Sequence, residues 1–163
     1  MPPDLPAGLL IGLSVAVLLL LWVLLLRMVG RRLRRARAAA PPPPPPAGDP
    51  VLRIPLVAAF AGWRGLPWLA WASSDLRPLL ELHPGHMACR VLRLRRHPYT
   101  AIARVDHRST RGTENVVLEF HGRLASFAGN TANRALARQA IAALRDRGCP
   151  LSPRAAALLA EPG

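Results

Sequence analysis

Arginine is the residue whose number and spacing most clearly suggest chemistry in this chain. All 22 basic residues are arginines, nine acidic residues oppose them, and the formal net charge is +13. A guanidinium group can bind a phosphate or a carboxylate through two parallel hydrogen bonds. Four arginines surround one expected turn between strands and form the candidate site for an anionic ligand or lipid headgroup: Arg90, Arg93, Arg95 and Arg96. A solvated loop tip is the alternative interpretation, and Arg104, Arg108 and Arg111 could extend the patch.

A second arginine cluster follows an uncharged apolar run, Leu9 to Leu26. Its members are Arg27, Arg31, Arg32, Arg34, Arg35 and Arg37. With Ala7 and Gly8 the run reaches about 20 residues, the length at which an α-helix crosses a hydrocarbon core about 30 Å thick. The positive-inside rule then places the N-terminus outside and the C-terminal domain in the cytoplasm, with the cluster as a juxtamembrane basic segment. We therefore expect a single-pass protein of the inner (cytoplasmic) membrane, with a transmembrane helix at 7–26 and the lipid bilayer as a partner.

The sequence shows no arrangement of residues that is typical of an active site. Ser126 lacks the elbow motif of a nucleophilic serine, and the glycines at 62 and 65 are not followed by Lys and Ser or Thr, as a phosphate loop requires. Glu81 and Glu119 occupy alternating strand positions and are expected to face solvent rather than to form an acid/base pair. We therefore expect no catalytic residues and no enzymatic activity. Nucleic acid is not an expected partner, because only the basic charge favours it and no aromatic platform accompanies the arginines.

The histidines and cysteines do not predict a metal or cofactor site. His83, His86 and Cys89 follow the spacing H-x2-H-x2-C, with the two imidazoles on either side of a Pro-Gly turn. A structural zinc ion needs about four converging ligands, and Cys89 is expected to face the core. Cys89 and Cys149 also lack a redox or paired metal spacing, so we interpret them as two buried thiols.

Composition divides the chain into successive parts. These are an extracytoplasmic N-terminus at 1–6, the transmembrane helix at 7–26, an arginine-rich and polyproline linker at 27–50, a folded domain at 51–149 and a tail at 150–163 with room for a short helix. The prolines at 41–46 predict a polyproline II rod of roughly 20 Å. A GxxxG pattern at Gly8 and Gly12 offers a homodimer through the transmembrane helix.

Alternating apolar residues predict a series of short antiparallel strands in the folded domain. The expected strands are Val51–Phe60, Trp68–Ala72, Leu80–His83, Met87–Val91, Tyr99–Val105, Val116–Phe120 and Leu124–Phe127. Residues 51–74 carry three of the four tryptophans, so an interfacial membrane element is the alternative to the first two strands and their turn at Gly62–Pro67. A helix with an apolar stripe then begins at Asn130 or Thr131 and ends at Gly148.

The order of features from Leu79 to Cys149 resembles that of bacterial pleckstrin-homology-like (PH-like) domains. The likeness runs through the strand at 80–83, Pro84–Val91, a basic turn, Pro98–Val105, Asn115–Phe120, Leu124–Phe127 and the terminal helix. The resemblance implies a small α+β, mainly β domain, a bent antiparallel barrel of about seven strands capped by a C-terminal helix. Residues 51–72 would supply its first strands. It also implies a binding or scaffold role but not a phosphoinositide site, because lipid binding is not uniform among bacterial members of the family.

Together these observations predict a membrane-anchored, cytoplasmic PH-like module that binds or organises other molecules without catalysis. The expected partner is a protein. The alternative is a sensor of anionic lipid headgroups at the membrane surface, which would use the arginine patch at 90–96.

Overall fold

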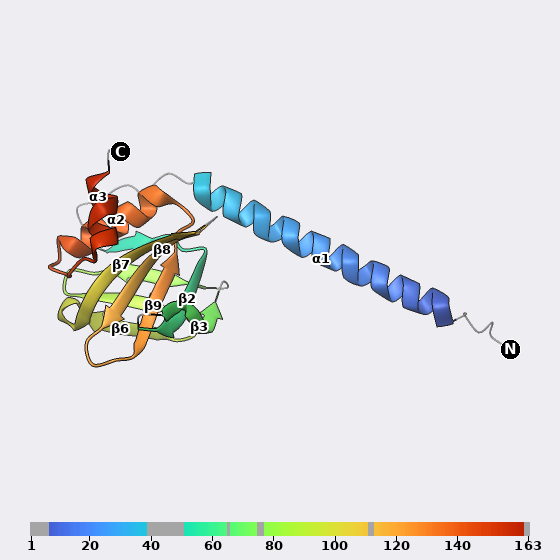
Figure 1. The fold of residues 1–163 in the computed structure, drawn as a ribbon, viewed down its shortest axis with the longest axis horizontal. Helices are drawn as coiled ribbons and strands as arrows, with labels where there is room; N and C mark the ends of the chain where they lie inside the picture. Colours follow the sequence, from blue (N-terminus) through green and yellow to red (C-terminus); the bar gives the residue numbers. More distant parts are fainter. Residues whose placement is uncertain (1–6, 39–50, 65, 75–76, 111–112, 162–163) are drawn as a thin grey trace. The chain divides into compact units, whose positions relative to one another are not determined.

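The structure, a computed structural model of the 163-residue chain, describes residues 7–38, 51–64, 66–74, 77–110 and 113–161. The chain divides into two compact units, residues 1–35 and 36–163, which are taken separately below. Most of helix α1 belongs to the first unit, and the strands and the remaining helices belong to the second (Figure 1). The expected polyproline rod at 41–46 lies outside the described residues.

Helix α1 (Ala7–Ala38) contains the apolar run and continues beyond it through the arginine cluster. Arginine has a high helix propensity, so the helix does not end where the apolar residues end. Within the described part of the chain, no helix combines the length and the apolar character that crossing a membrane requires. The expected transmembrane helix at 7–26, and with it the single-pass location in the inner membrane and its orientation, is therefore wrong. The apolar run is one part of a 32-residue helix rather than an element of its own.

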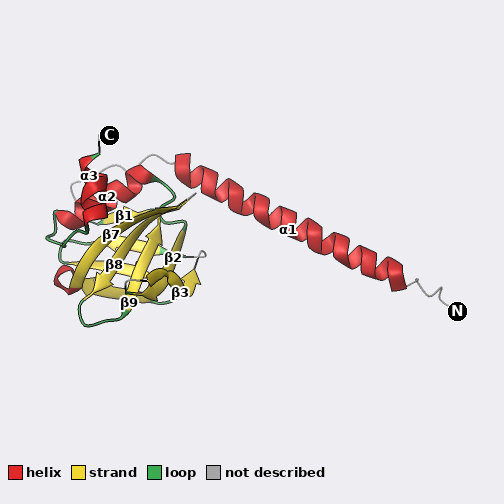
Figure 2. Cartoon of the chain, viewed as in Figure 1, coloured by secondary structure: helices red, strands yellow, loops and turns green. Residues whose placement is uncertain are grey.

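The second unit contains two antiparallel sheets (Figure 2). The strand order of the first sheet is β1 (Leu52–Ile54), β4 (Leu79–Leu82), β5 (His86–Arg90) and β6 (Leu94–Pro98). The strand order of the second is β3 (Leu66–Ser74), β2 (Ala58–Trp63), β9 (Ala125–Asn130), β8 (Thr113–Phe120) and β7 (Ile102–Thr110). A short 3-10 helix, η1 (Tyr99–Ala101), leads from β6 in the first sheet to β7 in the second.

The alternation of side chains decides which face of each strand meets the core. β4 and β5 form the hairpin that the sequence predicts, and Leu80 lies opposite Cys89 in it. Both side chains are buried and belong to the apolar core. Pro55 separates β1 from β2, because proline has no N–H to donate to a strand ladder. The single strand expected at 51–60 is therefore two strands, and they belong to different sheets.

Two helices follow the last strand. α2 (Arg134–Arg145) begins after Asn133, whose side chain accepts a hydrogen bond from the Leu136 N–H. α3 (Pro153–Ala160) begins after Ser152, which caps it in the same way. α2 packs against β7 and β8, and α3 packs against β7 and α2.

The expected barrel of about seven strands is wrong in its number of strands. The second helix, α3, lies in the tail at 150–163, where the sequence left room for a short helix. The described residues form nine strands in two sheets, followed by two helices. One additional strand arises because Pro55 interrupts the expected first strand. The other additional strand is β6, which pairs with β5 from Arg90 to His86. The sequence indicates only a basic turn there, because the arginines hide the alternation of apolar residues that predicts a strand.

The topology places the helices and the arginine-rich turn at opposite ends of the strands. The start of α2 adjoins the β7–β8 end, where the Thr131 N–H donates to the Glu114 carbonyl over 2.8 Å. Its far end adjoins the β4–β5 turn, because Arg147 lies over the Tyr99 ring and the Tyr99 hydroxyl donates to the His83 carbonyl. The β5–β6 turn (91–93) and the β8–β9 turn (121–124) lie at the other ends of β5 and β8. We call this second end the open end (Figure 1).

A buried carboxylate, Asp106, joins the second sheet to the C-terminal segment. Its oxygens accept hydrogen bonds from Ser152 Oγ (2.6 Å), Arg154 Nη2 (2.9 Å) and Arg108 Nε (3.2 Å). Burial alone raises the pKa of the Asp106 carboxyl, but the hydrogen bonds from Ser152 and Arg108 and the charge of Arg154 outweigh it and hold the pKa below its usual value. Asp106 is therefore ionised in the folded protein at neutral pH and stabilises it.

We expect Asp106→Asn to lower the free energy of unfolding by about 3 kcal/mol at neutral pH, because it leaves two arginines without their buried counter-charge. Urea denaturation of the full chain measures this change. Because the folded-state pKa is depressed, the stabilisation is complete above the unfolded-state pKa of about 3.9. It is lost as the pH falls through the lower folded-state value.

The control is Asp146→Asn, which removes an exposed carboxylate whose ion pair within the described residues is with the neighbouring Arg145 and which should leave stability unchanged. The prediction is contradicted if the two substitutions lower the free energy of unfolding equally, or if the loss caused by Asp106→Asn does not become smaller in acid. Either result would show that the Asp106 charge does not stabilise the fold.

Candidate functional site

A pocket of about 350 Å³ lies at the open end. Its apolar wall comes from both sheets and consists of Ala61, Val91, Leu92, Phe120, Ala125 and Phe127. Its polar lining consists of Arg93, Arg95, Arg123, His97, Cys89 and Ser126. The site is thus an apolar cavity with three arginines among its lining residues.

The register of β6 decides which of its arginines reach the pocket. Arg95 lies opposite Cys89 on β5, and Cys89 faces the core, so Arg95 is on the inner face of the first sheet. Arg96 lies opposite Ala88 and is therefore on the outer face. Arg95 and Arg96, although adjacent in the sequence, therefore lie on opposite faces of the first sheet.

The β8–β9 turn brings the third arginine, Arg123, to the pocket. The chain reverses at Gly122, whose φ of 64° is a left-handed conformation that glycine adopts without strain. Sequence reasoning did not select Arg123. The His-Gly-Arg turn directly after a predicted strand was the available signal, but nothing in it shows which other turn lies beside it.

The acidic residues are paired elsewhere, which leaves the pocket positive. Each acidic residue that the structure describes forms an ion pair with an arginine outside the pocket: Glu81, Asp106, Glu114, Glu119, Asp146 and Glu161. None of the pocket's lining residues is acidic. Among the described residues, no ion pair involves Arg93, Arg95 or Arg123. The site therefore attracts anions.

The two titratable groups inside the pocket are held neutral. Burial lowers the pKa of His97, and the positive charges of Arg123 and Arg95 lower it further. Burial raises the pKa of the Cys89 thiol to about 12, although Arg95 opposes the shift. At neutral pH the pocket lining thus includes a neutral imidazole and a protonated thiol, and the charge is carried by the arginines.

The structure divides the four arginines that the sequence selected. Arg93 and Arg95 line the pocket. Arg90 instead donates from Nε to the Arg77 carbonyl over 2.9 Å, and Arg96 is exposed on the outer face of β6. Of the juxtamembrane set, Arg27, Arg31 and Arg34 are exposed on α1, and the side chains of Arg32, Arg35 and Arg37 lie outside the described residues.

The arginines expected to extend the patch have other roles. Arg104 pairs with Glu119 (2.9 Å) and Arg108 with Asp106 (3.2 Å). The side chain of Glu119 is 1% exposed, which corrects the expectation that it faces solvent. The five residues from Val116 to Phe120 are all buried, so both faces of β8 are covered. Arg111 lies outside the described residues.

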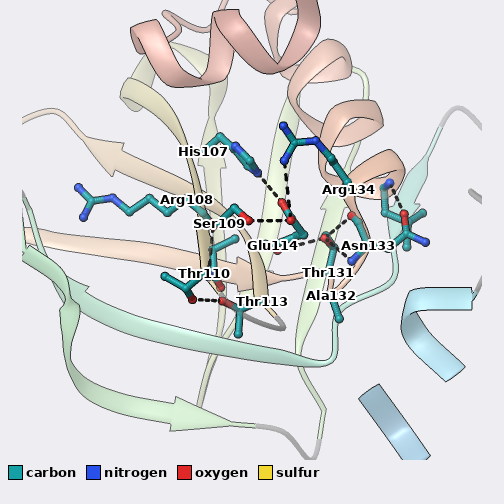
Figure 3. Close-up of polar contacts among 12 residues, drawn as sticks. His107, Arg108, Ser109, Thr110, Thr113, Glu114, Thr131, Ala132, Asn133 and Arg134 are labelled. Carbon is teal, nitrogen blue, oxygen red and sulfur yellow. Dashed lines mark hydrogen bonds and ion pairs between the residues drawn. The ribbon is translucent and has the colours of Figure 1, made fainter. Parts of the chain in front are cut away.

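A second polar cluster surrounds Glu114, where β7, β8 and the start of α2 meet (Figure 3). His107 Nε2 lies 2.7 Å from Glu114 Oε2, and Ser109 Oγ donates to Oε1 over 2.8 Å. Arg134 Nη1 lies 3.9 Å from Oε1. A nucleophilic serine needs an imidazole between its hydroxyl and the carboxylate, whereas here the carboxylate lies between the hydroxyl and the imidazole. The arrangement supports a network that joins the three elements.

No protein-family model matches the chain, and no curated protein matches its sequence. The resemblance to PH-like domains therefore stays a prediction.

Both thiols should react slowly in the folded protein. The pKa of Cys89 is raised to about 12 and that of Cys149 to about 11, in both cases mainly by burial. At pH 8 the thiolate fraction of each is then about two to three orders of magnitude below that of a free cysteine. A time course with Ellman's reagent on the full chain measures the rates. Denaturing the protein should restore the rate of a free thiol, and a fast phase in the native protein would contradict the burial of the two thiols.

Proposed function

We propose that the domain at 51–160 is a non-enzymatic binding module, which docks a partner protein with an acidic surface onto its open end. The observation that carries the proposal is the distribution of exposed apolar side chains. Among the described side chains of this domain, the exposed large apolar ones are Trp63, Leu92, Leu94 and Leu124. All four lie at the open end, on the β5–β6 turn, the β8–β9 turn or the strand ends beside them.

Clustering of this kind has a physical cost for a protein that stays alone. Leu92 and Leu124 are 68% and 69% exposed, and Leu94 is 48% exposed. Covering an apolar patch with a partner removes it from water and lowers the free energy of the system. Exposed patches of this kind mark interaction sites. Arginine is also enriched at interfaces, and here Arg96 lies on the outer face beside the leucines. We call Leu94, Arg96 and Leu124 the rim; Leu92 beside them also lines the pocket.

The charge of the chain indicates the chemistry of the partner. The formal net charge is +13. Among the described residues, Glu119 pairs with Arg64 beside Trp63, but no ion pair involves Arg93, Arg95, Arg96 or Arg123. A partner surface that carries carboxylates around an apolar centre would complement the rim in both respects. The Glu114 cluster has the geometry of a connecting network rather than of an activated nucleophile, which also favours a binding role.

Site-specific photo-crosslinking in cells that naturally make the protein tests this proposal. A benzophenone side chain placed at position 94 or 124 should give a discrete protein adduct, because both positions lie in the expected interface. The matched position is Arg145, which is exposed on α2 at the helix-covered end. With the crosslinker at 124, Leu94→Glu should reduce the adduct about tenfold or more, as truncation of an interface hot spot does.

Two results would overturn the proposal. One is the lack of a discrete adduct from positions 94 and 124, or equal adducts from position 145. The other is that the purified chain sediments with vesicles of phosphatidylcholine and phosphatidylglycerol and that Leu94→Glu/Leu124→Glu no longer does. That result would assign the rim to anionic lipid headgroups. Because the substituted leucines are exposed, both variants should unfold at the same temperature as the parent chain.

A further inference from the structure

We propose that the pocket at the open end is a separate binding site for a small amphiphilic anion, a carboxylate or monophosphate on a single apolar tail. The head group would lie against Arg95 and Arg123, and the tail would fill the cavity. This site uses the inner face of β6 and goes beyond the proposed docking of a protein on the rim.

The walls of the cavity indicate an apolar tail. Cys89, Phe120 and Phe127 line it, and each is about 5% exposed or less although it borders the pocket. They come from β5, β8 and β9, that is, from both sheets, so the cavity extends from the surface toward the core. Transfer of an apolar tail from water into such a space is favourable, whereas a polar tail would lose its hydrogen bonds to water there.

The volume limits the size of the tail. At roughly 30 Å³ for each water molecule in the liquid, a space of about 350 Å³ holds about a dozen non-hydrogen atoms. That matches one medium-length alkyl chain or one bicyclic ring system. A lipid with two long chains is too large for the cavity, and a peptide could place only one side chain there.

The arginines indicate a negative head group. Arg93, Arg95 and Arg123 line the pocket, no acidic residue does, and no described carboxylate pairs with any of the three. A guanidinium next to an apolar wall binds an anion more strongly than one in open water, because fewer water molecules compete. A neutral ligand would leave this charge uncompensated, and a cationic one would be repelled.

His97 adds a polar contact inside the mouth of the site. Its ring is buried and lies 4.3 Å from the Phe120 ring, centroid to centroid. The charges of Arg123 and Arg95, together with burial, keep it neutral. A neutral imidazole can donate one hydrogen bond to a head group without adding another charge beside Arg95 and Arg123.

Calorimetric titration of the full chain with decanoate, below its micelle concentration, tests the proposal. Decanoate and decyl phosphate carry the predicted combination of groups. Decanol lacks the charge, decyltrimethylammonium reverses it, and acetate lacks the tail. Decanoate or decyl phosphate should bind at least tenfold more tightly than each of these three, and the stronger of the two identifies the preferred head group.

Matched variants assign the binding to the pocket. Arg95→Gln/Arg123→Gln should weaken decanoate binding at least tenfold, whereas Arg96→Gln, on the outer face of the same strand, should change it less than twofold. Ala125→Phe should block the tail and abolish binding while leaving all three arginines in place. The arginines are exposed, so the Gln variants test the site even where the Phe variant fails to fold.

Lack of decanoate and decyl phosphate binding, or equal affinity for decanol, would overturn the inference. So would equal effects of the inner-face and outer-face Gln variants. These outcomes are independent of the rim, because Leu94→Gln/Leu124→Gln, which adds no charge beside Arg95 and Arg123, should leave decanoate binding intact, and the pocket variants do not alter the rim leucines.

Discussion

The carboxylate of Asp106 is the group on which the arrangement of the C-terminal half depends. It is fully buried, and it accepts a hydrogen bond from the same Ser152 hydroxyl that caps α3. A backbone pair between Val105 and the segment at 150–152 runs beside it. One charge therefore places α3 against β7, and α3 in turn packs against α2. α2 and α3 pack against β7, β8 and each other, whereas the described lining of the pocket comes from β2, β5, β6, β8, β9 and the turns between them.

The distribution of charge over the domain follows from how its few acidic residues are used. The described carboxylates stabilise contacts within the fold, and two of them, Asp106 and Glu119, do so while buried. Burying a carboxylate is unfavourable unless cations and hydrogen bonds compensate it, so each such group requires arginines of its own. Arg64 at the open end pairs with Glu119, but among the described residues no ion pair involves Arg93, Arg95 or Arg123. Their charge remains available at a place where apolar side chains are also exposed, and both binding proposals rest on that coincidence.

Local sequence patterns predict much of the domain and fail where distant segments meet. Period-two alternation predicts the hairpin of β4 and β5, and a Gly C-terminal stop with an apolar stripe predicts α2, because both patterns concern residues close in sequence. The same reasoning places Glu119 on a solvent face, since alternation distinguishes the two faces of a strand but does not show that both are covered. The arginines at 93–96 also predict a basic turn, whereas the structure pairs Leu94–Pro98 with β5 as strand β6. The largest correction concerns the apolar run at 9–26, which lies within α1, because no helix in the described part of the chain combines the length and apolar character that crossing a membrane requires.

By itself, the sequence determined that the second half of the chain is a small, strand-rich, strongly basic domain closed by a helix, and it selected two of the three arginines that line the pocket. Tertiary structure alone decided the rest. Pairing of β2 with β9 joins segments more than 60 residues apart and completes the second sheet. The register of β6 turns Arg95 inward and Arg96 outward, and the β8–β9 turn adds Arg123. A site made by side chains on separate turns depends on which strands are neighbours, and that is settled by the packing of the whole core rather than by any local pattern.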